Sequence, residues 1–194
     1  MRVIGGSLRG RKLATVRGMA IRPTADRVRE ALFNILGQRS AAAHVLDLFA
    51  GTGAMGIEAL SRGARQALFI DQSAVAISLL QRNLALCHLE ARSRVVQWNI
   101  VKNLNPLHAY AGIFDLVFID PPYAKGIIAP CLAHLAASGT LAPDALIVVE
   151  HAPAEPITAL PGPLTCIDSR RYGQTAIAIL SRSREAIASN GFSC

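Results

Sequence analysis

The chain has 194 residues, is 52% hydrophobic and carries a formal net charge of +7. This length allows one domain with a sizeable core, and the hydrophobic content excludes an intrinsically disordered chain. The longest apolar runs, such as Ala145–Val149, are much shorter than the roughly 18–20 residues of a membrane span, so we expect a cytoplasmic protein without a membrane partner. The four cysteines form no CxxC pair, and we therefore expect no metal site.

The net positive charge comes entirely from the first 39 residues, which hold nine basic and two acidic side chains. Residues 40–194 hold eleven of each sign and are neutral. A basic segment attached to a neutral domain is typical of a phosphate-binding arm, although a solubilising tail would have the same composition. We expect residues 1–20 to form this arm, as an ordered segment or a small β-hairpin, and residues 21–194 to form one domain.

The chain after the arm predicts a helix and then an alternation of strands and helices. The first helix follows Arg22-Pro23-Thr24, has Thr24 as its N-cap and ends at Gly37. Its apolar residues recur with helical spacing, and Arg27 and Arg29 lie off that apolar face. The expected strands are 45–49, 67–70, 95–98, 114–119 and 145–149, and the expected helices are 54–62, 73–86 and 125–137, the last distorted or shortened by Pro130.

Two further strands, 164–171 and 174–180, are separated by Tyr172-Gly173, which is a hairpin signal. Strands that alternate with helices favour a parallel sheet covered on both faces, and a closing hairpin favours an antiparallel edge. The predicted fold is therefore α/β, with a doubly wound, mostly parallel sheet and an antiparallel C-terminal hairpin. Ligands of such sheets bind at the carboxyl ends of the strands, so we expect the functional residues in the turns after the strands.

The turn after the first predicted strand reads Asp47-Leu48-Phe49-Ala50-Gly51-Thr52-Gly53, and with Gly56 it matches the G-x-G-x-x-G pattern of dinucleotide sites. Asp47 favours a different cofactor, S-adenosylmethionine, because its carboxylate can accept the ammonium group of an amino-acid moiety. A pyrophosphate would instead need the helix N-terminus free of negative charge. Asp71 ends the second strand and can accept the ribose hydroxyls of either cofactor. Capping of backbone groups is the alternative explanation for both acids.

The turn after the fourth predicted strand reads Asp120-Pro121-Pro122-Tyr123. The exocyclic amine of a base is a poor nucleophile because its lone pair is delocalised into the ring. Two acceptors, the Asp120 carboxylate and the Pro121 carbonyl, can pull on the two amino protons and make the nitrogen more tetrahedral. The prolines remove competing N–H donors, and Tyr123 offers a ring on which a base can stack. The turn therefore predicts methylation of an exocyclic amino group, with Asp120, Pro121, Pro122 and Tyr123 as catalytic residues.

At this point the chain resembles a known family. Asp47–Gly53 is similar to motif I of class I methyltransferases, and Asp120–Tyr123 is similar to the [DN]PP[YFW] motif of amino-group methyltransferases. The flanking segments resemble the RsmD family over nearly the whole chain. These segments are Arg2–Ser7, Gly10–Leu13, Arg22–Thr24, Asp26–Phe33, Gly126 and Arg171–Gly173.

The resemblance implies a class I, Rossmann-like methyltransferase that modifies N2 of a guanine in 16S ribosomal RNA. Its partner would be ribosomal RNA, within a small-subunit particle or an assembly intermediate, and the protein would act as a monomer. Asn99 would stand where many relatives carry an acid near the adenine ring, and Ile100 would flank that ring. The expected cofactor-binding residues are Asp47, Phe49, Ala50, Gly51, Thr52, Gly53, Asp71, Gln72, Asn99, Ile100 and Asp120. The expected RNA-binding residues are Arg9, Arg11, Lys12, Arg22, Arg27 and Arg29.

Three alternatives remain open. One is methylation of adenine N6 or cytosine N4 in RNA or DNA, although the chain shows no large insertion for target recognition. Another is an NAD-dependent enzyme, which would leave Asp120–Tyr123 unexplained. The third is a non-catalytic RNA-binding module, which would bind RNA through the basic arm without binding a cofactor.

Overall fold

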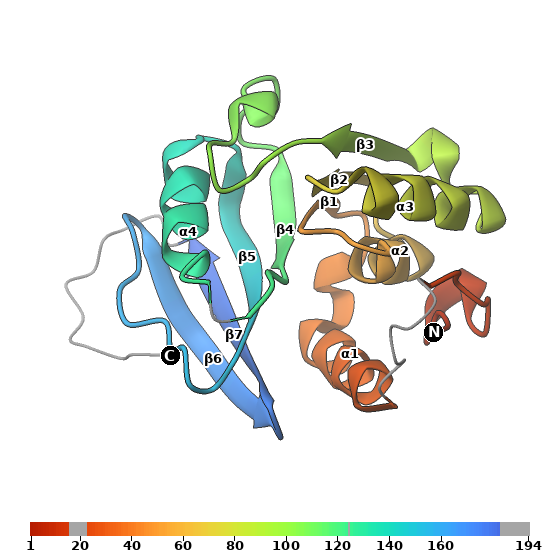
Figure 1. Cartoon of the computed structure of the whole chain (residues 1–194), viewed down its shortest axis with the longest axis horizontal. Helices are drawn as coiled ribbons and strands as arrows, with labels where there is room; N and C mark the ends of the chain where they lie inside the picture. Colours follow the sequence, from red (N-terminus) through yellow and green to blue (C-terminus); the bar gives the residue numbers. More distant parts are fainter. Residues whose placement is uncertain (16–22, 124, 183–194) are drawn as a thin grey trace. The chain divides into compact units, whose positions relative to one another are not determined.

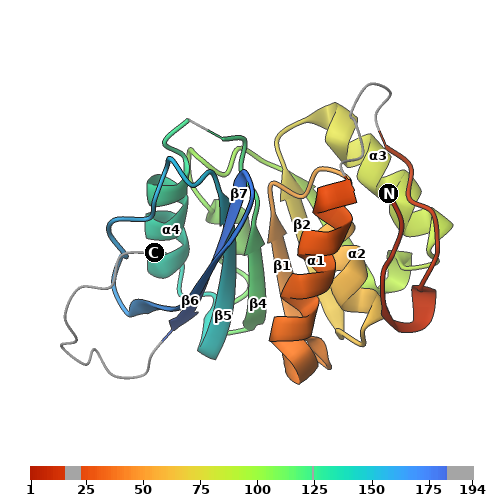
Figure 2. The ribbon, with the colours of Figure 1, turned by 90° about the horizontal axis from the view of Figure 1, so that it is seen from below.

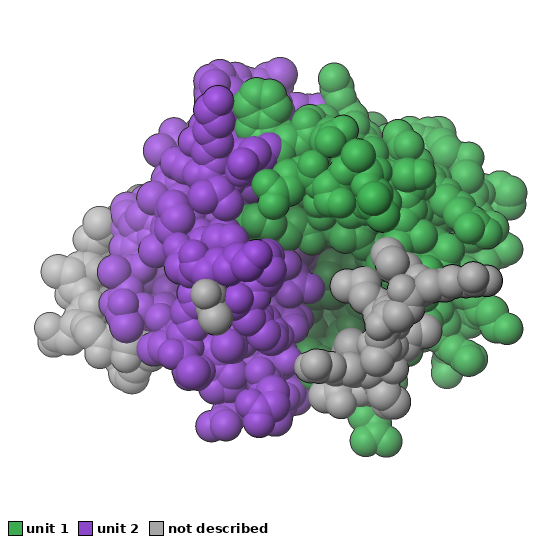
Figure 3. Space-filling model, viewed as in Figure 1, with its two compact units in different colours: residues 1–98 green, residues 99–194 purple. Residues whose placement is uncertain are grey.

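The computed structural model describes residues 1–15, 23–123 and 125–182, with the side chains of the first helix given from Asp26 onward. The chain forms two compact units, Met1–Trp98 (unit 1) and Asn99–Cys194 (unit 2). Figure 1 shows the elements of each unit, and Figure 3 colours the two units in a space-filling view. None of the helices in the described ranges is long and apolar enough to cross a membrane.

Unit 1 contains three parallel strands in the order β3-β2-β1. β1 and β2 are buried along most of their length, whereas the residues of the edge strand β3 are half-buried or exposed. α2 packs against β1 and β2 (Figure 2), and α3 packs against β2 and β3. Each helix connects two neighbouring strands, which is the crossover that a parallel pair requires. The elements are α1 (Pro23–Leu36), β1 (His44–Leu48), α2 (Ala54–Ser61), β2 (Gln66–Asp71), α3 (Ala74–Leu86) and β3 (Ser93–Gln97).

Unit 2 contains four strands in the order β4-β5-β7-β6. β4 and β5 are parallel, whereas β7 runs antiparallel to both β5 and β6. The interiors of β4, β5 and β7 are almost continuously buried, in keeping with their apolar sequences. The elements are β4 (Phe114–Ile119), α4 (Ile128–Ala137), β5 (Leu141–His151), β6 (Leu164–Tyr172) and β7 (Thr175–Arg182).

The predicted α/β fold with a mostly parallel arrangement and an antiparallel C-terminal hairpin is confirmed. Two details of the helices differ from expectation. The first helix begins at Pro23, so Thr24 lies inside it and is not its N-cap. The helix predicted at 125–137 begins at Ile128, which places Pro130 in its first turn. The helix is therefore shorter than predicted, which is one of the two effects expected of Pro130, and the proline is tolerated in the first turn because the first N–H groups of a helix have no partner within it.

The first 15 residues form an ordered arm on the surface of unit 1. An antiparallel bridge joins Arg2 to Lys12, and a single 3₁₀ turn, Gly6–Leu8, lies between them. Val3 and Leu13 are buried, at 1% and 6% exposure, so the arm contributes to the core as well as to the charge. The arm is therefore a packed part of unit 1 and not a solvated tail.

Two buried polar side chains fasten this arm to the helices. The carboxylate of Glu58, on α2, accepts hydrogen bonds from the backbone N–H groups of Ile4 and Gly5, at 2.8 Å each. The amide of Asn83, on α3, accepts from the N–H of Ala14 at 2.7 Å and donates to its carbonyl at 3.1 Å. Both residues are fully buried, so loss of the contacts with the arm would leave their polar groups without these hydrogen-bond partners.

Candidate active site

The backbone of the predicted cofactor turn is held in a conformation that few residues adopt. Phe49, Gly51 and Gly53 have positive φ angles of 60°, 54° and 78°. A left-handed conformation is uncommon for a residue with a side chain, so Phe49 marks a constrained position. Asp71 fixes the turn, because its Oδ2 accepts the N–H of Gly51 at 2.9 Å, and so joins the ends of β1 and β2.

Asn83 also contacts the predicted cofactor turn. In addition to its two bonds to the arm, its Nδ2 donates to the carbonyl of Thr52 at 2.9 Å. One buried amide thus contacts both the arm and the predicted cofactor turn. The sequence offered no signal for this residue, because it lies in the middle of an ordinary helical pattern.

Asp47, on β1, is only 2% exposed, and its Oδ2 accepts the backbone N–H of Gly56 at 2.9 Å. Burial raises the pKa of this carboxyl to about 7, against the lowering effect of the hydrogen bond from Gly56. A buried acid in this state is stabilised by a nearby cation, since the charged form lacks water around it. The group is therefore suited to an ammonium ligand.

The close approach between Asp47 and Gly56 depends on the absence of a side chain at position 56. A Cβ there would overlap the ring of Phe69, which is fully buried on β2. Gly56 thus serves the packing of α2 on β2, and its match to the dinucleotide pattern needs no pyrophosphate. The carboxylate of Asp47 also lies at the N-terminal turn of α2, where it would repel a phosphate group. The geometry disfavours NAD.

Asp71 is half-buried, and both of its oxygens accept backbone N–H groups. Oδ2 binds Gly51, and Oδ1 binds Ser73 at 2.8 Å, next to the N-terminus of α3. The capping role considered from the sequence is therefore present. A carboxylate oxygen can accept more than one hydrogen bond, so these contacts leave Asp71 able to accept ribose hydroxyls as well. Gln72 is exposed, and its carbonyl accepts from the side chain of Gln97 at 3.2 Å.

The two residues expected near an adenine ring lie at the start of unit 2. Asn99 is exposed, and its Oδ1 accepts the N–H groups of Val101 and Lys102 at 3.1 and 3.3 Å. This is a local turn-forming role. Ile100 is only 2% exposed, so a ring could flank it only if the side chains around it moved. The structure gives Ile100 a place in the core.

The Asp120–Tyr123 turn follows β4 directly. Asp120 and Pro122 are exposed and Pro121 is buried, while the side chain of Tyr123 is 37% exposed. The buried strand and the buried Pro121 give the turn a rigid base. Its exposed acid is one of the two acceptors of the amine-methylation hypothesis, and its partly exposed ring is the stacking surface of that hypothesis.

Two residues outside the predicted set hold Tyr123. Its hydroxyl donates to Oε1 of Glu150 at 2.7 Å and lies 3.1 Å from Oγ1 of Thr175. Burial raises the pKa of both Tyr123 and Glu150. The sequence signal for Glu150 was its place at the carboxyl end of a predicted strand. Thr175 had no such signal, because its contact depends on the hairpin folding back beside β5.

The predicted RNA-binding residues have different surroundings. Arg9, Arg11, Lys12 and Arg27 are exposed, as a phosphate contact requires. Arg22 lies outside the described residues. Arg29 is only 5% exposed, and its guanidinium donates to the carbonyl of Arg2 at 2.6 Å.

The arm covers the side chain of Arg29, so this guanidinium is bound within the protein and is not presented to a phosphate, and its contact with RNA stays a prediction. Its Nη2 also pairs with Asp26 at 3.2 Å, and its Nε lies 3.7 Å from Glu58. Glu58 in turn pairs with Arg62 at 2.8 Å. Arg29 thus belongs to a buried ionic cluster that fixes α1, α2 and the arm together.

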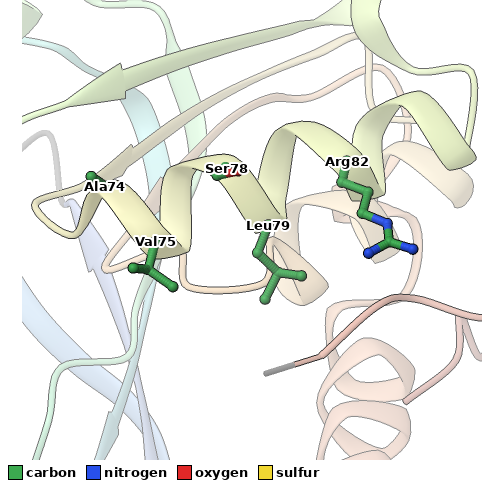
Figure 4. A pocket seen from close by; sticks show the side chains of 5 residues that line it. All are labelled: Ala74, Val75, Ser78, Leu79 and Arg82. Carbon is green, nitrogen blue, oxygen red and sulfur yellow. The ribbon is translucent and has the colours of Figure 1, made fainter. Parts of the chain in front are cut away.

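A hollow of about 520 Å³ lies along α3. Figure 4 shows the five side chains that line it, and none of them is a predicted site residue. Their mixture of apolar groups with one guanidinium does not define a chemical site. The lining residues are Ala74, Val75, Ser78, Leu79 and Arg82.

Within unit 1 the structure brings together the turn Asp47–Gly53 and Asp71, which contact through Gly51. Within unit 2 it joins Tyr123, from the turn after β4, to Glu150 and Thr175. The first group offers two acids of different exposure to a ligand, and the second offers a restrained aromatic ring beside an exposed acid. Among the described residues no cluster of His, Cys, Asp and Glu could hold a metal ion.

Comparisons with known proteins agree with this geometry. Residues 1–181 match the family described as "Conserved hypothetical protein 95". The chain is 37% identical to ribosomal RNA small subunit methyltransferase D of Escherichia coli (strain K12), over 95% of this chain and 91% of that protein. It is 35% identical to YlbH of Bacillus subtilis (strain 168), over 94% of this chain and 99% of YlbH.

A solved structure of yhhF from Escherichia coli has the same fold, with a TM-score of 0.83 and 36% sequence identity. The similarity covers 95% of this chain and 99% of that one. The match therefore includes both units and the basic arm. The chain belongs to the family described as conserved hypothetical protein 95, which is the RsmD family that its sequence motifs resemble.

Proposed function

We propose that the protein transfers the methyl group of S-adenosylmethionine to N2 of a guanine in small-subunit ribosomal RNA. The observation that carries this proposal is the Asp120–Tyr123 turn, with its exposed acid and its restrained ring at the end of a buried strand. The similarity to a protein named ribosomal RNA small subunit methyltransferase D supports the choice of substrate.

The residues of unit 1 fit the cofactor. The Asp47 carboxylate would accept a hydrogen bond from the ammonium group of the methionine moiety, directly or through water, and this cation would stabilise the ionised form that burial, by raising the pKa, disfavours. Asp71 would accept the ribose hydroxyls while it keeps its bonds to the backbone. S-adenosylmethionine supplies a methyl group on a sulfonium, which is activated without any metal. Asn99, Gln72 and Ile100 remain proposed contacts of the adenosine part.

The residues of the second turn act on the base. The Asp120 carboxylate and the Pro121 carbonyl would accept the two protons of the amino group, so that the nitrogen lone pair becomes available. When bound, the sulfonium would supply the methyl group to this nitrogen, with the N–C bond forming as the C–S bond breaks, and the extra proton on nitrogen would leave to water. The face of Tyr123 would hold the flipped-out base by stacking, which contributes about 1–3 kcal/mol.

The exposed basic side chains of the arm and of α1 would bind RNA phosphates. These are Arg9, Arg11, Lys12 and Arg27, and Arg22 remains proposed with them. An arm of this size is too small to enclose an RNA fold. We therefore propose that the substrate is a small-subunit particle or an assembly intermediate in the cytoplasm, and that the protein acts on it as a monomer.

The decisive experiment is mass spectrometry of nucleosides from the ribosomal RNA of a strain that lacks this protein. We expect N2-methylguanosine to decrease at one position of the small-subunit RNA and to return on complementation. Restoration must fail with a variant that carries Asp120→Ala. An unchanged N2-methylguanosine level, or the loss of a methylated adenine or cytosine in its place, would overturn the proposal.

Calorimetry separates the cofactors independently of RNA. We expect saturable binding of S-adenosylmethionine by the purified protein and none of NAD. Binding of NAD alone would restore the dinucleotide hypothesis, and binding of neither ligand would favour a non-catalytic RNA-binding module.

A further inference from the structure

We infer that Glu150 and Thr175 are positioning residues, which hold the ring of Tyr123 in one orientation so that the target base meets a preformed stacking surface. This inference rests on the proposed function. It assigns roles to two residues that lie outside both sequence motifs, on strands that come after them in the chain.

The first support is where the two partners are anchored. Glu150 lies near the end of β5, and Thr175 is the first residue of β7. These strands are antiparallel neighbours, and Glu150 pairs with Ile177 in their register. The tyrosine, by contrast, lies in a loop. Two points fixed on adjacent strands of one sheet therefore restrain a side chain that its own backbone segment would leave free to change rotamer.

The second support is the direction of the two hydrogen bonds. A phenol has one proton, and at 2.7 Å it is donated to the carboxylate of Glu150. The hydroxyl of Thr175, 3.1 Å away, is then the donor in the second bond. The phenolic oxygen thus donates one hydrogen bond and accepts another. Two bonds in different directions fix the tilt of the ring as well as its position.

The third support is exposure. The side chain of Tyr123 is 37% exposed, so part of the ring is available to a ligand while its hydroxyl is engaged by the protein. An exposed ring without such bonds would lose rotamer freedom each time a base bound, and that loss would weaken binding. Holding the ring beforehand removes this cost from the step in which the flipped base is bound.

The direct test is Tyr123→Phe, which keeps the ring and removes only the two hydrogen bonds. The matched control is Tyr110→Phe, because the hydroxyl of Tyr110 is buried in unit 2 with no hydrogen-bond partner among the described residues. Methyl transfer to small-subunit particles from a strain that lacks the protein is measured at saturating S-adenosylmethionine. We expect Tyr123→Phe to lower kcat/KM for the particle about tenfold, as the loss of the hydrogen bonds that hold the ring implies. Tyr110→Phe should remain at the wild-type value.

Variants of the partners separate positioning from general stability. Glu150→Gln keeps an acceptor oxygen and should stay within about threefold of the wild type, whereas Glu150→Ala should match Tyr123→Phe. The double variant Tyr123→Phe with Glu150→Ala should be no worse than either single one, because all three lack the same bond. Thr175→Val should have a smaller effect, in the same direction. The dissociation constant for S-adenosylmethionine should be unchanged in every variant.

Each adverse result has one meaning. If Tyr123→Phe and Tyr110→Phe are equally active, or if the effects of Tyr123→Phe and Glu150→Ala multiply in the double variant, the positioning role is refuted while the methyltransferase function stands. If Glu150→Gln is as impaired as Glu150→Ala, the carboxylate acts by its charge and not as a tether, which also overturns the inference. If the wild type itself methylates no guanine in these particles, the proposed function fails first.

Discussion

Asp47→Asn tests whether the buried carboxyl on β1 is held at an energetic cost until a cation arrives. The pKa of this group is raised from 3.8 to about 7 by burial. The folded protein therefore binds the proton more tightly than the unfolded chain does. The contribution of the group to stability is full below pH 4 and is lost as the pH rises toward 7. Asparagine cannot ionise, so the variant lacks this pH dependence.

The expected change in unfolding free energy with pH follows from the shift in the pKa of Asp47. One pKa unit corresponds to 1.36 kcal/mol, and pH 5 and pH 7 both lie within the window between the two pKa values. Between these two values the wild type should lose about 2–3 kcal/mol of unfolding free energy relative to Asp47→Asn. Any constant penalty from the buried amide cancels in this difference. Urea unfolding of the cofactor-free proteins at pH 5, 6, 7 and 8 measures it.

Binding of S-adenosylmethionine should reverse the preference of Asp47 for its protonated form. An ammonium group beside Asp47 favours the ionised form, so binding of S-adenosylmethionine at pH 6 should release protons from the wild type and fewer from Asp47→Asn. Calorimetry in two buffers of different ionisation enthalpy measures this release. Parallel pH–stability curves for the two proteins, or equal proton release on binding, would show that Asp47 is neither strained in the free protein nor the acceptor of the ammonium group.

Further substitutions separate catalysis, RNA binding and folding. Asp120→Ala should keep its affinity for S-adenosylmethionine and lower single-turnover methyl transfer about 100- to 1,000-fold, because it removes one hydrogen-bond partner of the transition state. Near-normal turnover would contradict the acceptor role of Asp120. Replacing Arg9, Arg11 and Lys12 by Ala should reduce the slope of log affinity for RNA against log salt by about 2, and an unchanged slope would make the arm a solubilising feature. Arg29→Ala should leave that slope unchanged and destabilise the protein by about 2 kcal/mol or more in urea, because it removes a buried charge from an ionic cluster. Gly56→Ala should destabilise by about 1–3 kcal/mol through overlap with Phe69, and a wild-type unfolding midpoint would show that α2 can shift away from β2.

The sequence predicted the features that depend on local pattern. Apolar runs marked the strands, and glycines with acids marked both turns, so the fold class and the positions of Asp47, Asp71 and Asp120 could be stated without coordinates. These signals are local because a strand and the turn after it are contiguous. The family resemblance then supplied the substrate, which no local pattern contains.

The sequence could not predict side-chain contacts that join distant parts of the chain. Helical spacing correctly placed Arg29 off the apolar face of α1, but it could not show that the arm folds back over that side chain. In the same way, Glu150 and Thr175 are 27 and 52 residues from Tyr123, and only the pairing of β5 with β7 reveals them as its partners. The burial of Ile100 could not be predicted from the sequence either, because exposure is a property of the packed unit, and its contact with the adenine ring stays a proposal.

The attachment of the arm also sets an order of events during synthesis. Ala14 leaves the ribosome before its partner Asn83, which comes 69 residues later in the chain. At the usual 5–20 residues per second, the basic arm lacks its contact with Asn83 for roughly 3 to 14 seconds after it is made. Throughout that interval its arginines and lysine belong to a nascent chain beside ribosomal RNA, the polymer that the finished protein is proposed to modify. Completion of α3 ends this period, and from then on the arm is available to RNA only as part of a folded unit.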